Sequence, residues 1–201
     1  MTISIALDVD GILTNFDDHW RQCAEQVLGR PVLRVSDDHS MRTRYALTNK
    51  ECDAVWEAYH AGEWHRLPLY PHAAELIHAL EQFGTVWAVT SVKDLRKKDR
   101  AASLEGLIPE SQILCVGEQS AQNKMLAMHT IGVRAGHKPV AFLDDHPENV
   151  NAVLPVVGLT VLLDRGYTGL PDTEYGVTVI DDPMDFPVLV EQFLKRTGRA
   201  V

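Results

Sequence analysis

The sequence is poor in cysteine and has no paired-cysteine motif. Three cysteines occur among the 201 residues, Cys23, Cys52 and Cys115. An odd number of widely spaced cysteines without a C-x-x-C pair predicts neither a disulfide framework nor a zinc site. Such usage is typical of a protein in a reducing compartment.

Long hydrophobic runs are also missing. The longest, residues 152–163, is shorter than the roughly 18 apolar residues of a membrane helix, and it is broken by Pro155 and Gly158. The first residues lack the basic start of a secretory signal and soon reach acidic side chains. We therefore expect a cytoplasmic protein without a membrane partner.

Basic side chains are in the minority. Lys and Arg number 19 against 28 Asp and Glu, which gives a net charge of −9, and the basic residues form no long block. This balance argues against a nucleic-acid polymer as partner. A small phosphorylated substrate would need positive potential supplied locally by its site. Nothing in the pattern indicates an oligomeric state.

What the sequence does contain is an alternation of short apolar runs and longer helical patterns. The runs are nearly continuous in apolar residues, which indicates strands covered on both faces. This alternation predicts an α/β protein with a doubly wound parallel sheet. We expect strands at 3–7, 85–89, 112–116, 140–143, 159–163 and 177–180, and helices at 72–83, 94–104, 122–129 and 184–195.

Residues 15–70 interrupt the alternation. Two helical patterns, residues 16–28 and 50–61, occur there without a convincing strand. We interpret residues 1–14 and 71–201 as an α/β core and residues 15–70 as a helical insertion. The insertion follows the carboxyl end of the first strand, and open α/β sheets bind ligands at that edge.

The strongest chemical signal is I-A-L-D-V-D-G-I-L-T, residues 5–14. A buried strand ends in Asp8 and Asp10, whose side chains share one face because they are two residues apart. Like charges this close favour a bound cation, and their oxygens suit Mg²⁺. An acidic turn would explain D-x-D alone, but the longer pattern D-x-D-G-x-x-T favours a functional site.

Two weaker signals follow. The strand V-W-A-V-T-S ends in Thr90 and Ser91, which could bind a phosphate, although capping of the next helix is the commoner reason for such residues. Lys124 lies near the start of an expected helix and could neutralise both a carboxylate and a phosphoryl oxygen. Lys138, just before the next strand, is the alternative lysine.

A second acidic pair, Asp144 and Asp145, ends the strand V-A-F-L. The pair Asp181 and Asp182 repeats this pattern after the last expected strand, so one of the two pairs is a plain turn. We favour the first pair because one helix and one strand separate it from Lys124.

In this order, the four pieces resemble the motifs of the haloacid dehalogenase superfamily of hydrolases. The matching residues are Asp8, Asp10, Gly11 and Thr14 for its first motif, Thr90 for the second, Lys124 for the third, and Asp144 and Asp145 for the fourth. The resemblance covers residues 1–14 and 71–201. The helical insertion lies where this superfamily places its C1 cap.

The resemblance implies a Mg²⁺-dependent phosphatase. Asp8 would attack phosphorus and Asp10 would act as acid and base. Asp8, the Asp10 main chain and Asp145 would hold Mg²⁺, with Asp144 one step further away, while Thr90, Ser91 and Lys124 would bind the phosphate. True dehalogenases of the superfamily lack an acid at the position of Asp10, so its presence favours phosphoryl chemistry.

The substrate is less clearly indicated. The small cap, the stretch L-P-L-Y-P-H-A-A-E-L-I and the V-T-S strand end are similar to the 5′(3′)-deoxyribonucleotidases, so a nucleoside monophosphate is our first hypothesis. A sugar-phosphate or other metabolite phosphatase and a catalytically silent regulatory protein are the alternatives. Cap residues expected to set specificity are Arg42, Arg44, Tyr45 and Trp64. We interpret the charged run 93–100 as a solvated helix face.

Overall fold

The computed structural model describes residues 3–104, 106–117 and 120–198. Six parallel strands form one sheet in the order β3-β2-β1-β4-β5-β6. The strands are β1 (Ile3–Leu7), β2 (Gly84–Thr90), β3 (Ile113–Cys115), β4 (Ala141–Asp144), β5 (Leu159–Leu163) and β6 (Thr178–Ile180). The expected doubly wound parallel α/β sheet is therefore confirmed, and each expected strand is found within a residue or two.

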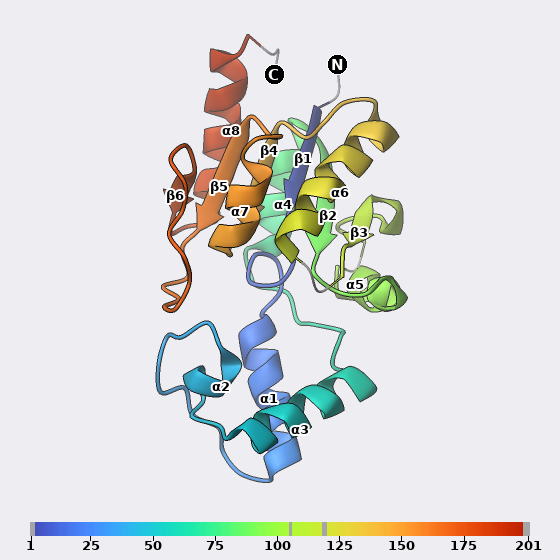
Figure 1. Cartoon of the computed structure of the whole chain (residues 1–201). Helices are drawn as coiled ribbons and strands as arrows, with labels where there is room; N and C mark the ends of the chain where they lie inside the picture. Colours follow the sequence, from blue (N-terminus) through green and yellow to red (C-terminus); the bar gives the residue numbers. More distant parts are fainter. Residues whose placement is uncertain (1–2, 105, 118–119, 199–201) are drawn as a thin grey trace.

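Helices cover both faces of this sheet (Figure 1). The core elements are α4 (Ala73–Glu81), η1 (Asp94–Arg96), α5 (Lys97–Ser103), η2 (Glu110–Gln112), α6 (Ser120–Ala135), α7 (Pro147–Val153) and α8 (Asp185–Arg196). One apolar layer joins the sheet to α4, α8 and the end of α5, and the other joins it to α6 and α7. Every residue of β1 is buried, as a central strand covered on both faces requires.

The residues between β1 and α4 form only helices and loops in the structure. The helices are α1 (Phe16–Leu28), α2 (Met41–Arg44) and α3 (Asn49–Ala61). They pack around an apolar cluster of their own that includes Trp20, Val55 and Tyr59. In Figure 1 these helices lie below the carboxyl ends of the strands, at the edge where ligands bind in open α/β sheets.

Two chain segments connect these helices to the sheet, and they run side by side. The amide of Asn15 donates to the carbonyl of Pro68, and the amide of Tyr70 donates to the carbonyl of Leu13, both at 2.9 Å. A third connection comes from the loop after β5. The amide of Thr168 donates to Asp37 at 2.8 Å, and the carbonyl of Thr168 accepts from His39 at 3.0 Å.

None of the helices formed by the described residues has the length and apolar character needed to cross a bilayer.

Candidate active site

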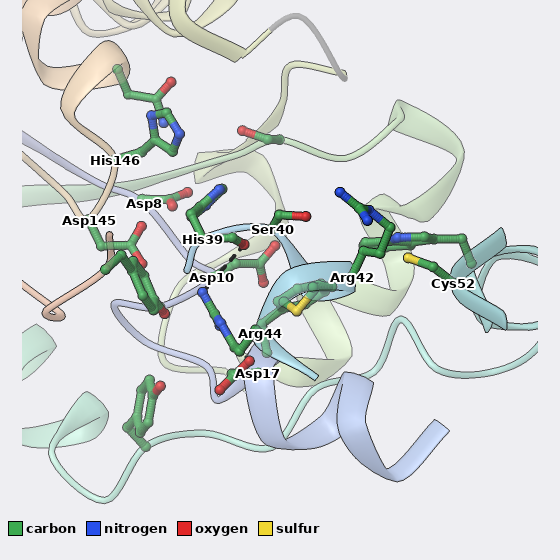
Figure 2. A pocket seen from close by; sticks show the side chains of 18 residues that line it. Asp8, Asp10, Asp17, His39, Ser40, Arg42, Arg44, Cys52, Asp145 and His146 are labelled. Carbon is green, nitrogen blue, oxygen red and sulfur yellow. Dashed lines mark hydrogen bonds and ion pairs between the residues drawn. The ribbon is translucent and has the colours of Figure 1, made fainter. Parts of the chain in front are cut away.

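The carboxyl ends of β1, β2 and β4 open into a cavity of about 500 Å³ that lies between the sheet and the helices of residues 16–61. Both parts of the chain contribute to its lining, which includes Asp8, Asp10, Ser91, Asp145 and His146 from the core and Asp17, His39, Ser40, Arg42 and Arg44 from the helical segment. Figure 2 shows Asp8 and Asp145 at one end and Arg42 with Cys52 at the other. An elongated ligand could therefore contact both parts of the chain.

Lys124 is completely buried beside the first carboxylate. Its Nζ lies 2.8 Å from Oδ1 of Asp8 and 2.5 Å from Oδ2 of Asp144, so one ammonium group faces two acids. The side chain comes from the first part of α6, which packs over the sheet. Lys138, the alternative from the sequence, is exposed at the surface.

Asp144 and Asp145 point in different directions. Both oxygens of Asp144 accept hydrogen bonds from within the protein, from Asn149, Lys124 and the main chain of His146. Asp145 lies instead on the cavity wall. The rival pair is exposed after β6, where Asp182 accepts from the amide of Met184 as a turn residue would.

The main chain of Gly11 leaves room for Asp145. Gly11 has φ of +79°, and a Cβ atom at this position would lie 1.9 Å from Oδ2 of Asp145. Only glycine satisfies both the left-handed backbone and this close approach. Both the backbone conformation and the lack of space for a Cβ atom therefore explain why the D-x-D-G pattern has glycine at this position.

The site is rich in negative charge. Burial raises the pKa of Asp8 well above its usual range; Lys124 opposes this effect, whereas Asp144, Asp145 and Asp10 add to it. Burial and the neighbouring Asp144 also raise the pKa of Asp145 to about 7. A single buried ammonium group therefore does not fully compensate these carboxylates.

A divalent cation fits this donor set. Asp8, Asp144 and Asp145 each offer a carboxylate oxygen, and the three oxygens lie within 4.8 Å of one another. Hard oxygen donors of this kind suit Mg²⁺. Because the oxygens of Asp144 are already occupied by hydrogen bonds, Asp8 and Asp145 have the oxygens best placed to hold it.

Asp10 is held by two side chains. Its Oδ2 accepts from Nη2 of Arg100 at 2.8 Å, and its Oδ1 accepts from Oγ1 of Thr14 at 3.1 Å. Thr14 of the D-x-D-G-x-x-T pattern thus fixes one oxygen, as part of the turn after β1. Arg100 was not anticipated, because the charged run 93–100 predicts only a solvated helix face.

The end of β2 also meets the site. Oγ1 of Thr90 is buried and has no hydrogen-bond partner among the described residues. Ser91 lines the cavity. An unused hydroxyl donor beside a serine at a strand end suits an oxygen-rich ligand.

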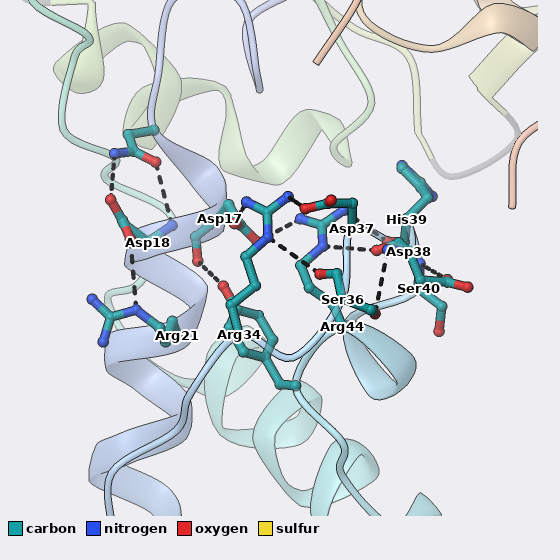
Figure 3. Close-up of polar contacts among 12 residues, drawn as sticks. Asp17, Asp18, Arg21, Arg34, Ser36, Asp37, Asp38, His39, Ser40 and Arg44 are labelled. Atoms are coloured by element: carbon teal, nitrogen blue, oxygen red, sulfur yellow. Dashed lines mark hydrogen bonds and ion pairs between the residues drawn. The ribbon is translucent and has the colours of Figure 1, made fainter. Parts of the chain in front are cut away.

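On the opposite wall, Arg44 and Asp17 form an ion pair (Figure 3). Nη1 of Arg44 lies 2.5 Å from Oδ1 of Asp17, and the Arg44 side chain is only 1% exposed. The guanidinium also lies 4.4 Å from the ring centre of Tyr167, a residue of the loop after β5. The charge of Arg44 is therefore largely compensated before any ligand binds.

The other expected cap residues differ in their access to the cavity. Arg42 lines it and is exposed. Tyr45 is 3% exposed and stacks on Trp20 at 5.8 Å, within the aromatic core of the helical segment. Trp64 is half-buried and packs against that core and His19 rather than on the cavity wall.

Several residues that line the cavity or contact its lining carry no sequence signal. Arg165, in the loop after β5, donates through Nε to the carbonyl of Gly11 at 2.8 Å and through Nη2 to the same oxygen. Its guanidinium lies 4.8 Å from the ring centre of Tyr70. The ring of His39 lies 4.8 Å from that of His146. Only the fold brings together these residues, which are far apart in the sequence.

No protein-family model and no curated protein sequence matches this chain. The fold, however, is that of the haloacid dehalogenase-like hydrolases. A member of that group from Xanthomonas campestris shares 15% identity, with a TM-score of 0.65 and 99% of each chain covered.

Two further structures show that this fold serves different chemistries. A predicted phosphoglycolate phosphatase from Haemophilus somnus 129PT shares 18% identity, with a TM-score of 0.63 and with 94% of this chain and 98% of the other covered. An L-2-haloacid dehalogenase from Xanthobacter autotrophicus, with chloropropionic acid covalently bound, shares 14% identity, with a TM-score of 0.58 and coverages of 95% and 99%. Identities this low speak for the fold, and the chemistry must be argued from the site.

Proposed function

We propose that this protein is a Mg²⁺-dependent phosphomonoesterase that acts through an aspartyl-phosphate on Asp8. The observation that carries the proposal is the pairing of two differently held carboxylates in one cavity. Asp8 faces a buried lysine, and Asp10 lies beside it with both oxygens oriented by neighbours. A nucleophile and an acid–base group are what phosphate ester hydrolysis in two steps requires.

Each residue has a role in the proposed reaction. Asp8 attacks phosphorus while Asp10 protonates the ester oxygen that leaves, and Asp10 then takes a proton from the water that hydrolyses the intermediate. Lys124, the Thr90 hydroxyl and Ser91 bind the phosphoryl oxygens. A bound Mg²⁺, held by Asp8 and Asp145, would supply positive charge to the transferring group.

Asp10 is also the reason for preferring phosphoryl transfer over carbon–halogen cleavage. A halide ion leaves carbon without a proton, whereas an alkoxide leaving from phosphorus needs one. The hydrogen bonds from Arg100 and Thr14 keep a proton-transferring carboxyl group at the cavity.

A nucleoside monophosphate is the proposed substrate class. The cavity is wide enough for more than a phosphate, and several aromatic rings line it, namely Phe16, Trp56, Tyr70, Tyr167 and the imidazole of His39. Such rings favour a stacked base. A sugar phosphate is the alternative, and the polar side chains of Ser40, Asp17 and Arg42 on the same wall favour it.

The test is phosphate release from a panel of phosphomonoesters with and without Mg²⁺. The panel contains ribo- and deoxyribonucleoside monophosphates, sugar phosphates and p-nitrophenyl phosphate. We expect Mg²⁺-dependent turnover that Asp8→Asn abolishes and that Asp181→Asn, at the exposed acidic pair, leaves unchanged. A folded wild-type protein that hydrolyses none of these esters would contradict the proposal.

A further inference from the structure

One side of residues 94–103 supports the chain as it returns from the helical segment to the core. Arg96, Arg100 and Ser103 are spaced by four and three residues, so a helical backbone places them on one side. Arg96 donates to the carbonyl of His60, Arg100 donates through Nη1 to the carbonyl of His65 at 3.3 Å, and Ser103 Oγ accepts from the amide of Leu67 at 2.8 Å.

Among these three residues of the described chain, only Arg100 contacts an acidic group of the cavity. Its Nη2 lies 2.8 Å from Oδ2 of Asp10, and its side chain is 1% exposed against 25% for Asp10. A single guanidinium therefore joins the carbonyl of His65 to the carboxylate of Asp10. The planar fork of arginine allows this because its nitrogens donate in different directions.

We propose that Arg100 is a positioning residue that holds Asp10 in the orientation for proton transfer and links this orientation to the return segment at His65. The inference rests on the proposed function, because it assigns a task to the neighbour of the acid–base group. Proton transfer needs the carboxyl group within hydrogen-bond reach of the leaving oxygen. Without Arg100, the hydrogen bond from Thr14 would be the one side-chain contact from the described residues left to orient Asp10.

The leaving group of the substrate distinguishes this role from a structural one. In the first step, the Asp8 oxygen forms a bond to phosphorus, the ester P–O bond breaks, and the proton of Asp10 passes to the leaving oxygen. An alkoxide needs that proton, whereas p-nitrophenolate leaves without it. The value of kcat/KM reports this step, so it should be measured for an alkyl phosphate and for p-nitrophenyl phosphate.

For Arg100→Met, we expect kcat/KM to fall about 100-fold with the alkyl ester, the scale of general acid catalysis, and less than about 5-fold with the aryl ester. Arg100→Lys should recover part of the loss because it keeps a cation near Asp10. Asp10→Asn should show the same selective loss, and adding Arg100→Met to it should change kcat/KM little further. Circular dichroism and thermal unfolding establish that each variant is folded.

Two matched controls come from the same helix side. Arg96→Met removes a contact to the end of α3 and Ser103→Ala a contact to the returning chain, neither of which touches Asp10, so both should keep the wild-type ratio of the two esters. If Arg100→Met does not fold, Arg100→Lys carries the comparison, with an expected shift of about tenfold in that ratio.

An equal loss with both esters, or a full additional loss in the double variant, would overturn the inference while leaving the phosphatase proposal intact. Wild-type protein that hydrolyses neither ester would overturn both.

Discussion

The ammonium nitrogen of Lys124 lies 2.8 Å from Oδ1 of Asp8, and the two side chains are 0% and 8% exposed. The same nitrogen lies 2.5 Å from Asp144, so Lys124 is a cation shared by two acids. The pair joins α6 to the end of β1 and combines two tasks, because it stabilises buried negative charge and presents a positive group to a phosphoryl oxygen.

Replacing Lys124 should therefore impair both stability and activity. Lys124→Met leaves Asp8 and Asp144 buried without their counter-ion, and removal of one partner from a buried pair costs about 3–5 kcal/mol. We expect that decrease in the free energy of urea unfolding and a loss of turnover of more than about 1000-fold. Lys138→Met, at an exposed lysine, should change neither quantity, and a stable, active Lys124→Met variant would contradict the assignment.

Adding one methyl group at Gly11 should disturb Asp145, which we propose as a ligand of Mg²⁺. Gly11→Ala would place Cβ 1.9 Å from Oδ2 of Asp145, and the left-handed backbone costs roughly 1–2 kcal/mol more for alanine. We expect Mg²⁺ affinity, measured by isothermal titration, to fall at least about tenfold, as changes around metal ligands commonly cause.

Gly136→Ala is the matched control for this variant. Gly136 also has φ of +79°, but apart from its chain neighbours no atom of the described residues lies within 4 Å of a Cβ built there. It should therefore show the backbone cost without the loss of Mg²⁺ affinity. Equal Mg²⁺ affinities in the two variants would show that Asp145 does not hold the ion.

Stability should fall in mild acid because of His65. This side chain is 4% exposed, and burial together with nearby Arg96 and Arg100 lowers its pKa to about 4. The unfolded chain, with an ordinary histidine pKa near 6.5, gains a proton between pH 6.5 and 4 that the folded protein does not. The free energy of unfolding should therefore decrease as the pH falls through this range, by at most about 1.4 kcal/mol per pH unit.

Urea unfolding of wild type and His65→Phe at pH 7.5, 6.5 and 5.5 tests this expectation. The variant cannot take up the proton, so its stability should depend less steeply on pH. His78→Gln removes a histidine whose side chain is 79% exposed and should keep the wild-type slope. Parallel slopes for wild type and His65→Phe would rule out this contribution.

The ion pair between Arg44 and Asp17 should show strong coupling. Asp17→Asn leaves the guanidinium of Arg44 buried without its carboxylate, and the cost should approach the roughly 3–5 kcal/mol of a broken buried pair, reduced by the 16% exposure of Asp17. Arg44→Met should also destabilise the protein, but the double variant should lose less than the sum. A double-mutant cycle by chemical unfolding measures this difference, and simple additivity would contradict a direct interaction.

The sequence was sufficient to predict the sheet, since the strands are short apolar runs, most of them buried, whose carboxyl ends are now found at one edge. Asp8, Asp10 and Asp145 could be expected at the cavity because parallel strands bring their carboxyl ends together, and Lys124, on the helix that precedes β4, could be expected beside them. The contacts of Arg100 with Asp10 and of Arg165 with Gly11 could not be expected. Their task depends on which loop or helix side faces the turn after β1, and local periodicity contains no such information.

Tyr45 is the opposite case, a residue that the sequence pattern placed at the cavity and the structure places in the core of the helical segment. An aromatic residue among arginines suggested a ligand contact, but α2 turns this ring inward against Trp20. Whether an aromatic residue of a small helical segment serves its own core or the cavity depends on helix packing, which the sequence pattern alone does not determine.

The hydrogen bonds of Thr168 bear on how the helices that cover the cavity could move. The two chain connections at residues 13–15 and 68–70 lie side by side. Thr168 joins residues 37–39 to the loop after β5 at a separate place. Any rotation of the helices about the two adjacent connections would have to break the hydrogen bonds that Thr168 makes with Asp37 and His39. Thr168 is not among the residues that line the cavity, yet its two main-chain hydrogen bonds are among the contacts that would have to break before the helices could move away from Asp8.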